Sequence, residues 1–130
     1  MEPCRLLLVD DEEEFVTTLA ERLSLRGIRA RVALSGEEAL QALDSEAAHV
    51  VVLDVLLPGM GGLEVLKRIR QAHPGVQVIL LTGRGSDQEA REGVALGAFD
   101  YLVKPVHLEE LIRKIREASK CNAMEKPWRR

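Results

Sequence analysis

Five side chains suited to chemistry each follow directly on a short apolar run, namely those of Asp10, Asp11, Asp54, Thr82 and Lys104. Carboxylates held together repel, by about 4 kcal/mol for a pair 4 Å apart at an effective dielectric of 20. One lysine cannot neutralise three of them, whereas a divalent cation can, and hard oxygen ligands favour Mg²⁺ or Mn²⁺. Such a site suits a phosphoryl group, and a spare carboxylate is then the nucleophile that forms an acyl phosphate.

The elements that must position these residues alternate between strand and helix. Continuous apolar runs at 50–53 and 76–81 are typical of strands buried on both faces of a parallel sheet. Apolar residues at 28, 30 and 32 alternate with arginines, which predicts an edge strand. Five strand–helix repeats predict an α/β fold with helices on both faces of a parallel sheet. Ligands of such sheets bind beyond the carboxyl ends of the strands, where the five side chains stand.

Local signals mark several element boundaries. Ser35 and Glu38 have the spacing of a capping box, and Gly27 stands where a helix would stop. Gly93 lies inside the helix expected from Ser86 to Leu96 and costs about 1 kcal/mol relative to alanine, so we expect this helix to be the least stable. Residues 121–130 lose helical periodicity, which predicts a C-terminal tail or linker stub after a domain at 4–120.

Composition restricts the class of protein. The chain has 130 residues, 46% of them hydrophobic and 30% charged, which is typical of one globular domain. Its net charge of -3 argues against direct nucleic-acid binding by this domain. No apolar run approaches the length of a membrane span, and the N-terminus has no secretory pattern. Cys4 and Cys121 do not make a disulfide framework, so we expect free thiols and a cytoplasmic protein without a membrane partner.

Four motifs stand at the strand ends: Leu8-Val9-Asp10-Asp11, Val52-Leu53-Asp54-Val55 with Pro58-Gly59-Met60, Leu80-Leu81-Thr82-Gly83, and Gly97-Ala98-Phe99-Asp100-Tyr101-Leu102-Val103-Lys104-Pro105. Together they resemble the motifs of response-regulator receiver domains of two-component signalling, including the chemotaxis-regulator type, over residues 4–120. The resemblance implies a flavodoxin-like fold, with five parallel strands in the order 2-1-3-4-5 and five helices in two layers around them.

The resemblance also implies a phosphorylation site. Asp54 would accept a phosphoryl group from a histidine kinase or from a phosphotransfer protein of a phosphorelay. Asp11 and Asp54, with the backbone carbonyl of Leu56, would hold Mg²⁺, or alternatively Mn²⁺, and Asp10 would position the metal through water. Such a domain takes part in its own phosphotransfer and slow dephosphorylation, and it is not otherwise an enzyme.

A switch is the further implication of the resemblance. Lys104 and the Thr82 hydroxyl would contact phosphoryl oxygens, and the movement of Thr82 would let Tyr101 swing inward. The surface formed by the fourth helix, the fifth strand and the last helix would then control a downstream protein or an attached output domain, or form a homodimer. A static, half-buried Tyr101 remains the alternative.

Two positions flank the expected path of the hydrolytic water. Leu56 stands two residues after Asp54, where relatives often have a polar residue or methionine, and Arg84 stands two residues after Thr82. An apolar Leu56 should not orient a water molecule, and Arg84 would shield the phosphoryl group. We therefore expect slow self-dephosphorylation.

Three other functions compete with a phosphorylated receiver. A flavin or nucleotide binder on the same sheet would need a glycine-rich phosphate loop, and neither common glycine motif occurs in the sequence. A phosphatase using Asp54 would need a general acid two residues later, which Leu56 cannot be. A pseudo-receiver that never carries phosphate would lack some of the five side chains. The sequence leaves open the cognate kinase, the output, the oligomeric state, the acyl-phosphate lifetime, and whether the domain stands alone.

Overall fold

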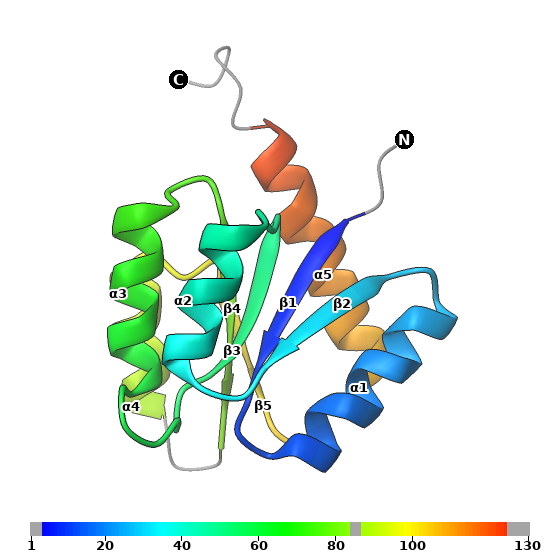
Figure 1. Ribbon diagram of the computed structural model, residues 1–130, viewed down its shortest axis with the longest axis horizontal. Helices are drawn as coiled ribbons and strands as arrows, with labels where there is room; N and C mark the ends of the chain where they lie inside the picture. The colour runs from blue at the N-terminus through cyan, green and yellow to red at the C-terminus, as the bar shows by residue number, and fades with distance from the viewer. Residues whose placement is uncertain (1–3, 84–86, 125–130) are drawn as a thin grey trace.

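The structure, a computed structural model, describes residues 4–83 and 87–124, and it contains one sheet of five parallel strands (Figure 1). The strands are β1 (Arg5–Val9), β2 (Arg29–Ala33), β3 (Val50–Asp54), β4 (Gln77–Thr82) and β5 (Asp100–Val103). The helices are α1 (Glu13–Leu25), α2 (Gly36–Ser45), α3 (Gly62–Ala72), α4 (Asp87–Ala95) and α5 (Leu108–Met124). The sheet order β2-β1-β3-β4-β5 confirms the expected fold class and topology.

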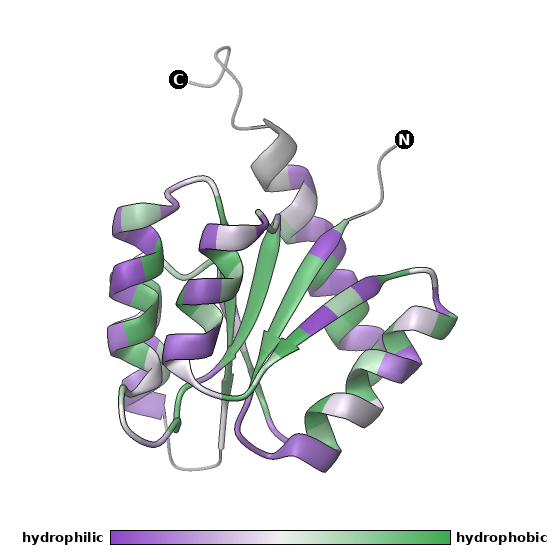
Figure 2. Ribbon diagram, in the orientation of Figure 1, coloured by the Kyte–Doolittle hydropathy of each residue, from purple (hydrophilic) through white to green (hydrophobic). Residues whose placement is uncertain are grey.

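Helices cover both faces of the sheet, α2, α3 and α4 on one side and α1 and α5 on the other (Figure 1). Successive strand side chains point to opposite faces, so each strand contributes to two cores. In β3, for example, Val51 and Leu53 pack with α2 and α3, whereas Val50 and Val52 pack with α1 and α5. All residues of β3 are buried, and β1, β3 and β4 are apolar along most of their length (Figure 2). The continuous apolar runs therefore mark strands buried on both faces, as predicted.

The predicted edge strand and helix signals are also present. β2 lies at the edge of the sheet, and α1 ends at Leu25 shortly before Gly27, whose φ is 82°. The Ser35 side chain accepts a hydrogen bond from the Glu38 backbone N–H at 3.1 Å. The Glu38 carboxylate accepts from the N–H of Leu34 at 2.9 Å, one residue before the usual capping-box donor.

Two glycines lie where helices approach the sheet closely. A Cβ atom on Gly93 would lie 2.1 Å from Leu80 Cδ1, so glycine lets α4 pack directly on β4. A Cβ atom on Gly62 would lie 2.5 Å from the carbonyl oxygen of Asp54 and 2.6 Å from Cα of Val55, both backbone atoms. Gly62 thus lets the start of α3 rest against the chain that follows β3. The lower stability expected of α4 stays a prediction, and Ser86, its expected start, lies outside the described residues.

The C-terminal helix is longer than the sequence pattern indicated. We expected a tail from residue 121, but α5 continues to Met124. The helix therefore extends four residues into the segment that we expected to be a tail. The division between a domain at 4–120 and a tail stays a prediction. Within the described part of the chain, no helix is both long enough and apolar enough to cross a membrane.

Candidate functional site

The register of the sheet brings the chemical side chains to one edge. Val9 of β1 pairs with Leu53 of β3, so the residues that follow them, Asp10 and Asp54, are neighbours. On the other side, Thr82 of β4 pairs with Val103 of β5, directly before Lys104. The carboxyl ends of parallel strands share an edge, and the predicted residues therefore meet there.

Two carboxylates are buried at this edge and held by backbone donors. Asp10 is 1% exposed, and its Oδ1 atom accepts a hydrogen bond from the N–H of Glu12 at 2.9 Å. Asp54 is 6% exposed, and its Oδ1 atom accepts from the N–H of Leu56 at 3.0 Å. The second oxygen of each carboxylate faces an ammonium group, so each buried charge is both oriented and paired.

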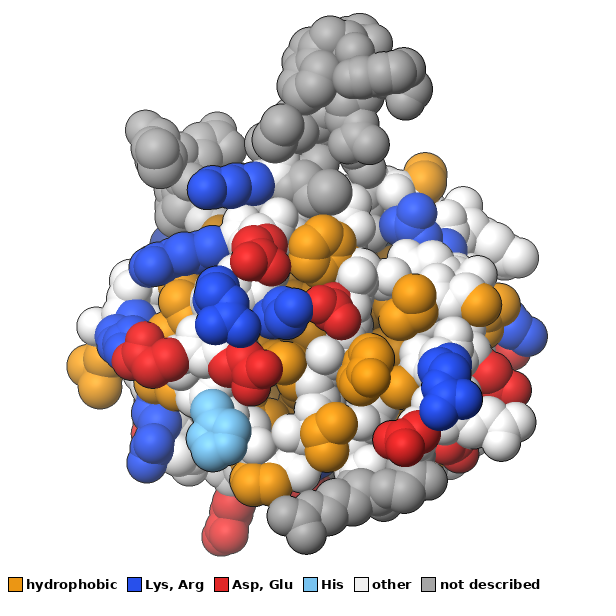
Figure 3. Space-filling view, turned by 180° about the vertical axis from the view of Figure 1, so that it is seen from behind, with side chains coloured by type: hydrophobic (Ala, Val, Ile, Leu, Met, Phe, Trp, Pro, Cys, Tyr) orange, Lys and Arg blue, Asp and Glu red, His pale blue; other side chains and the backbone are white. Residues whose placement is uncertain are grey.

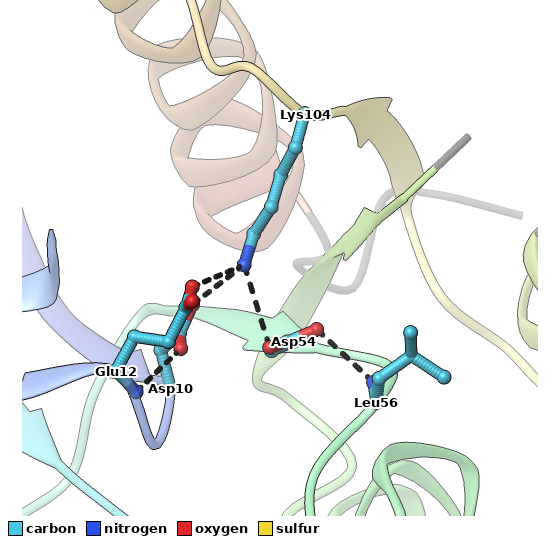
Figure 4. A network of polar contacts seen from close by, with 5 residues as sticks. All are labelled: Asp10, Glu12, Asp54, Leu56 and Lys104. Carbon is cyan, nitrogen blue, oxygen red and sulfur yellow. Dashed lines mark hydrogen bonds and ion pairs between the residues drawn. The ribbon is translucent and has the colours of Figure 1, made fainter.

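That ammonium group belongs to Lys104 (Figure 4). Its Nζ atom lies 3.1 Å from Asp10 Oδ2 and 3.4 Å from Asp54 Oδ2. A third carboxylate oxygen, Oε1 of Glu12, lies 3.3 Å away. The lysine is thus shared among several acids and does not neutralise them all.

The excess of acids fits a metal site. Asp10, Asp11 and Asp54 each offer a carboxylate oxygen, and these atoms all lie within 4.8 Å of one another. Asp11 is exposed, so the cluster opens to solvent on its side. Oxygen donors with more negative charge than one lysine can balance are the donor set that Mg²⁺ or Mn²⁺ prefers. The residues present therefore fit the predicted divalent cation.

The electrostatics of the cluster shift two pKa values. Burial raises the pKa of Asp10 above its ordinary 3.8, and the nearby Asp54 charge adds to this, although the Glu12 N–H and Lys104 act in the opposite direction. Burial lowers the pKa of Lys104, but its hydrogen bonds to Asp10 and Glu12 and the charges of Asp10 and Asp54 outweigh this effect, so its pKa lies above 10.5. Lys104 therefore stays charged at neutral pH.

The remaining predicted residues surround this cluster or lie farther out. Thr82 is buried at the end of β4, beside the end of β3. Tyr101 lies on β5 with 38% of its surface exposed, which fits both the switching residue and the static alternative. Leu56 is 60% exposed, and in Figure 4 its backbone nitrogen faces the Asp54 carboxylate while its side chain points away from it. Arg84 lies outside the described residues, and the assigned roles of these residues stay predictions.

The sequence alone does not identify two partners of Lys104. Glu12 lies at a predicted helix start, where acids favour the helix dipole, with a contact to the metal site as the alternative interpretation, and in the structure it pairs with the lysine. Phe15 has the spacing of a core residue of α1, yet its ring centroid lies 4.8 Å from Lys104 Nζ. No signal in the sequence links either residue to a lysine about ninety positions away, because that contact depends on how α1 leaves the sheet.

Comparisons with known proteins identify the family of this chain. The family described as the response regulator receiver domain matches residues 6–116. The transcriptional regulatory protein CpxR of Escherichia coli is 43% identical over 86% of this chain and 47% of its own length. The transcriptional regulatory protein YkoG of Bacillus subtilis, itself uncharacterised, is 40% identical over 94% of this chain and 54% of its own. The chain spans about half the length of these curated relatives.

Solved structures give the same answer for the fold. The receiver domain of NtrX from Brucella abortus superimposes with a TM-score of 0.85 at 32% identity, covering 88% of this chain and 98% of that one. A CheY-like receiver domain protein from Methanospirillum hungatei has a TM-score of 0.90 at 28% identity, covering 96% of this chain and all of that one. With the family match over most of its length, the chain belongs to the response regulator receiver domains of two-component systems.

Proposed function

We propose that Asp54 accepts a phosphoryl group from a phosphohistidine donor with the help of Mg²⁺. The observation that carries this proposal is the contact between Asp54 and Lys104 inside a cluster of three carboxylates. Asp54 is buried apart from an opening to solvent, and its orientation is held by the Leu56 N–H. Oriented nucleophiles beside fixed positive charge are what phosphoryl transfer requires.

In this reaction the P–N bond of the donor breaks and a P–O bond to the Asp54 carboxylate forms. The imidazole leaves with the electron pair and takes up a proton. Asp11, Asp54 and the Leu56 carbonyl would hold Mg²⁺, which would supply positive charge to the phosphoryl oxygens. Lys104 is close enough to Asp54 to neutralise another of these oxygens. The Thr82 hydroxyl, next to the end of β3, donates to a third.

Phosphorylation then changes the surface formed by α4, β5 and α5. This surface already exposes apolar side chains, those of Val94, Leu96, Tyr101 and Val103. Figure 3, which shows the molecule from behind, has hydrophobic side chains along the middle of this face with charged ones around them. An inward movement of Tyr101, coupled to Thr82, removes one of these exposed groups and changes what the surface binds.

The output of this surface is a protein contact. We propose that it binds a downstream protein or an attached output domain, or pairs with a second copy of the chain. CpxR and YkoG are transcriptional regulatory proteins about twice the length of the matched region, which supports an output domain joined to a receiver of this kind. The cognate kinase is proposed only by its chemistry, as a donor of phosphohistidine.

A small-molecule phosphodonor tests the proposal. Native protein incubated with acetyl phosphate and Mg²⁺ should gain the mass of one phosphoryl group, located at Asp54 by peptide mapping. Asp54→Asn should gain none. The matched control is Asp44→Asn, which removes an exposed aspartate of α2 outside the site and should be labelled like the native protein. Equal labelling of Asp54→Asn, or no labelling of the native protein, would contradict the proposal.

A further inference from the structure

The first turn of α1 forms two contacts with the site lysine. Glu12 directly precedes the helix and Phe15 lies three residues later, and both side chains contact Lys104. The Glu12 carboxylate lies 3.3 Å from Lys104 Nζ, and the centroid of the Phe15 ring lies 4.8 Å from the same atom. Lys104 is thus in contact with α1 as well as with the buried aspartates.

The ring is suited to holding an ammonium group in place. A cation within about 6 Å of the centroid over a ring face is attracted by the negative face of the aromatic quadrupole. Lysine carries its charge on a flexible four-carbon stem, so its position depends on what surrounds the Nζ atom. Asp10 and Asp54 attract that atom into the cluster, and the ring lies against it.

Phosphorylation changes one set of these contacts but not the other. When Asp54 becomes an acyl phosphate, its carboxylate no longer offers the same charge to Lys104, and the ammonium group must move to a phosphoryl oxygen. The Phe15 ring keeps its electrostatics through this change. It can therefore restrain Lys104 both before and after transfer.

We propose that Phe15 is a positioning residue for Lys104 in phosphoryl transfer to Asp54. This proposal rests on the proposed function, because it concerns a step of that reaction. The ring holds the ammonium group within reach of the reacting oxygens, and it does so through its quadrupole as well as its bulk.

A series of side chains at position 15 separates the two effects. Phe15→Leu and Phe15→Met keep an apolar side chain but remove the ring, whereas Phe15→Tyr and Phe15→Trp keep a ring. We expect the rate of phosphorylation by acetyl phosphate to fall about twofold to fivefold without the ring. Tyr and Trp should restore it. Phe99→Leu removes the other phenylalanine of the chain, packed in the same apolar core, and should leave the rate unchanged.

Two further readouts exclude a merely structural role. The Lys104 side-chain methylene protons, observed by NMR of labelled lysine, should show a ring-current shift that disappears in Phe15→Leu and is retained in Phe15→Tyr. In the Lys104→Met background, Phe15→Leu should cause no additional loss of rate. A rate that follows side-chain size instead of aromaticity, or an equal loss in the Lys104→Met background, would overturn the inference.

Failure of this inference differs from failure of the proposed function. If native protein is labelled at Asp54 but all the position-15 variants react equally fast, only the role of Phe15 is refuted. If native protein is not labelled, the phosphoacceptor proposal fails and the positioning role in that reaction fails with it. Thermal unfolding of each variant shows which of them are folded. If Phe15→Leu does not fold, Phe15→Met takes its place in the comparison, and if Phe15→Trp does not fold, Phe15→Tyr takes its place.

Discussion

Lys104 Nζ lies 3.4 Å from Asp54 Oδ2, although the two residues are 50 positions apart in the chain. Asp54 ends one central strand, and Lys104 follows the strand at the far edge of the sheet. Their contact is possible because β4, which lies between them, ends at the same level in Thr82. The site therefore depends on the alignment of several strand ends, and its energetics can be tested residue by residue.

Replacing Lys104 with methionine should destabilise the metal-free protein. Asp10 and Asp54 would lose their ammonium partner while remaining buried, at a cost of about 1–3 kcal/mol in the free energy of unfolding. Mg²⁺ should reduce the difference in the free energy of unfolding between native protein and Lys104→Met, because the cation neutralises the same carboxylates. Urea denaturation with EDTA and with Mg²⁺ measures both effects. Lys67→Met, at an exposed position of α3, is the control. Its free energy of unfolding should lie within about 0.5 kcal/mol of that of the native protein.

Asp11→Asn should abolish stabilisation by Mg²⁺ and slightly stabilise the metal-free protein. The substitution removes one of three mutually repelling carboxylates, and since Asp11 is exposed the gain should be about 0.5–1 kcal/mol. Melting temperatures measured across a Mg²⁺ titration give both the stability of the metal-free protein and the stabilisation by Mg²⁺. Asp44→Asn serves as the control. A variant that still gains stability from Mg²⁺ as the native protein does would show that Asp11 is not a ligand.

The raised pKa of Asp10 predicts how pH affects metal binding. An acid whose pKa is raised in the folded state favours folding most when it is protonated. Without metal, the contribution of Asp10 to the free energy of unfolding is therefore greatest below pH 3.8, and it is lost as the pH rises through the raised pKa of the folded state. By the proposed function Mg²⁺ would bind the ionised cluster, so its affinity should fall on acidification while the pH is still above 3.8. Thermal shifts at several pH values, comparing native protein with Asp10→Asn, isolate this contribution. If the Mg²⁺ affinity of the native protein starts to fall only below pH 3.8, the prediction from the raised pKa of Asp10 is wrong.

Gly62→Ala should destabilise the fold and slow phosphorylation of Asp54. The new methyl group would press on backbone atoms of Asp54 and Val55, which cannot move aside as a side chain can. Overpacking of this kind costs about 1–3 kcal/mol. Gly61→Ala is a closely matched control, because a Cβ there meets nothing within 4 Å and its φ is -63°. Equal stability of the two variants would refute the packing argument.

Leu56→Asn should shorten the lifetime of the acyl phosphate. The exposed leucine stands beside Asp54 and offers no hydrogen bond to an attacking water molecule, whereas asparagine does. Loss of the phosphoryl group after removal of the donor, followed by mass spectrometry, gives the rate. If the native acyl phosphate decays within seconds and the substitution leaves that rate unchanged, the prediction of slow self-dephosphorylation is wrong. Leu25→Asn, an exposed leucine at the end of α1, is the control.

The sequence by itself determined the order of the elements and the residues at the strand ends. A strand buried on both faces needs a continuous apolar run such as Val50–Leu53. Asp54 is the polar residue that ends this run, and it can therefore be identified from the sequence. The capping pattern at Ser35 is equally local. These features depend on residues that are close together in the chain, and they can therefore be predicted from the sequence pattern.

Only the tertiary structure decided which side chains surround Lys104. Glu12 and Phe15 read as parts of an amphipathic helix start, and their contact with the lysine depends on the direction in which α1 leaves β1. Gly62 follows Pro58 and Gly59 in a stretch typical of a loop, yet it is required by the approach of α3 to the backbone after Asp54. Such contacts join residues far apart in the chain, and they leave no periodicity or spacing to read because they are set by how the packed helices and strands approach one another.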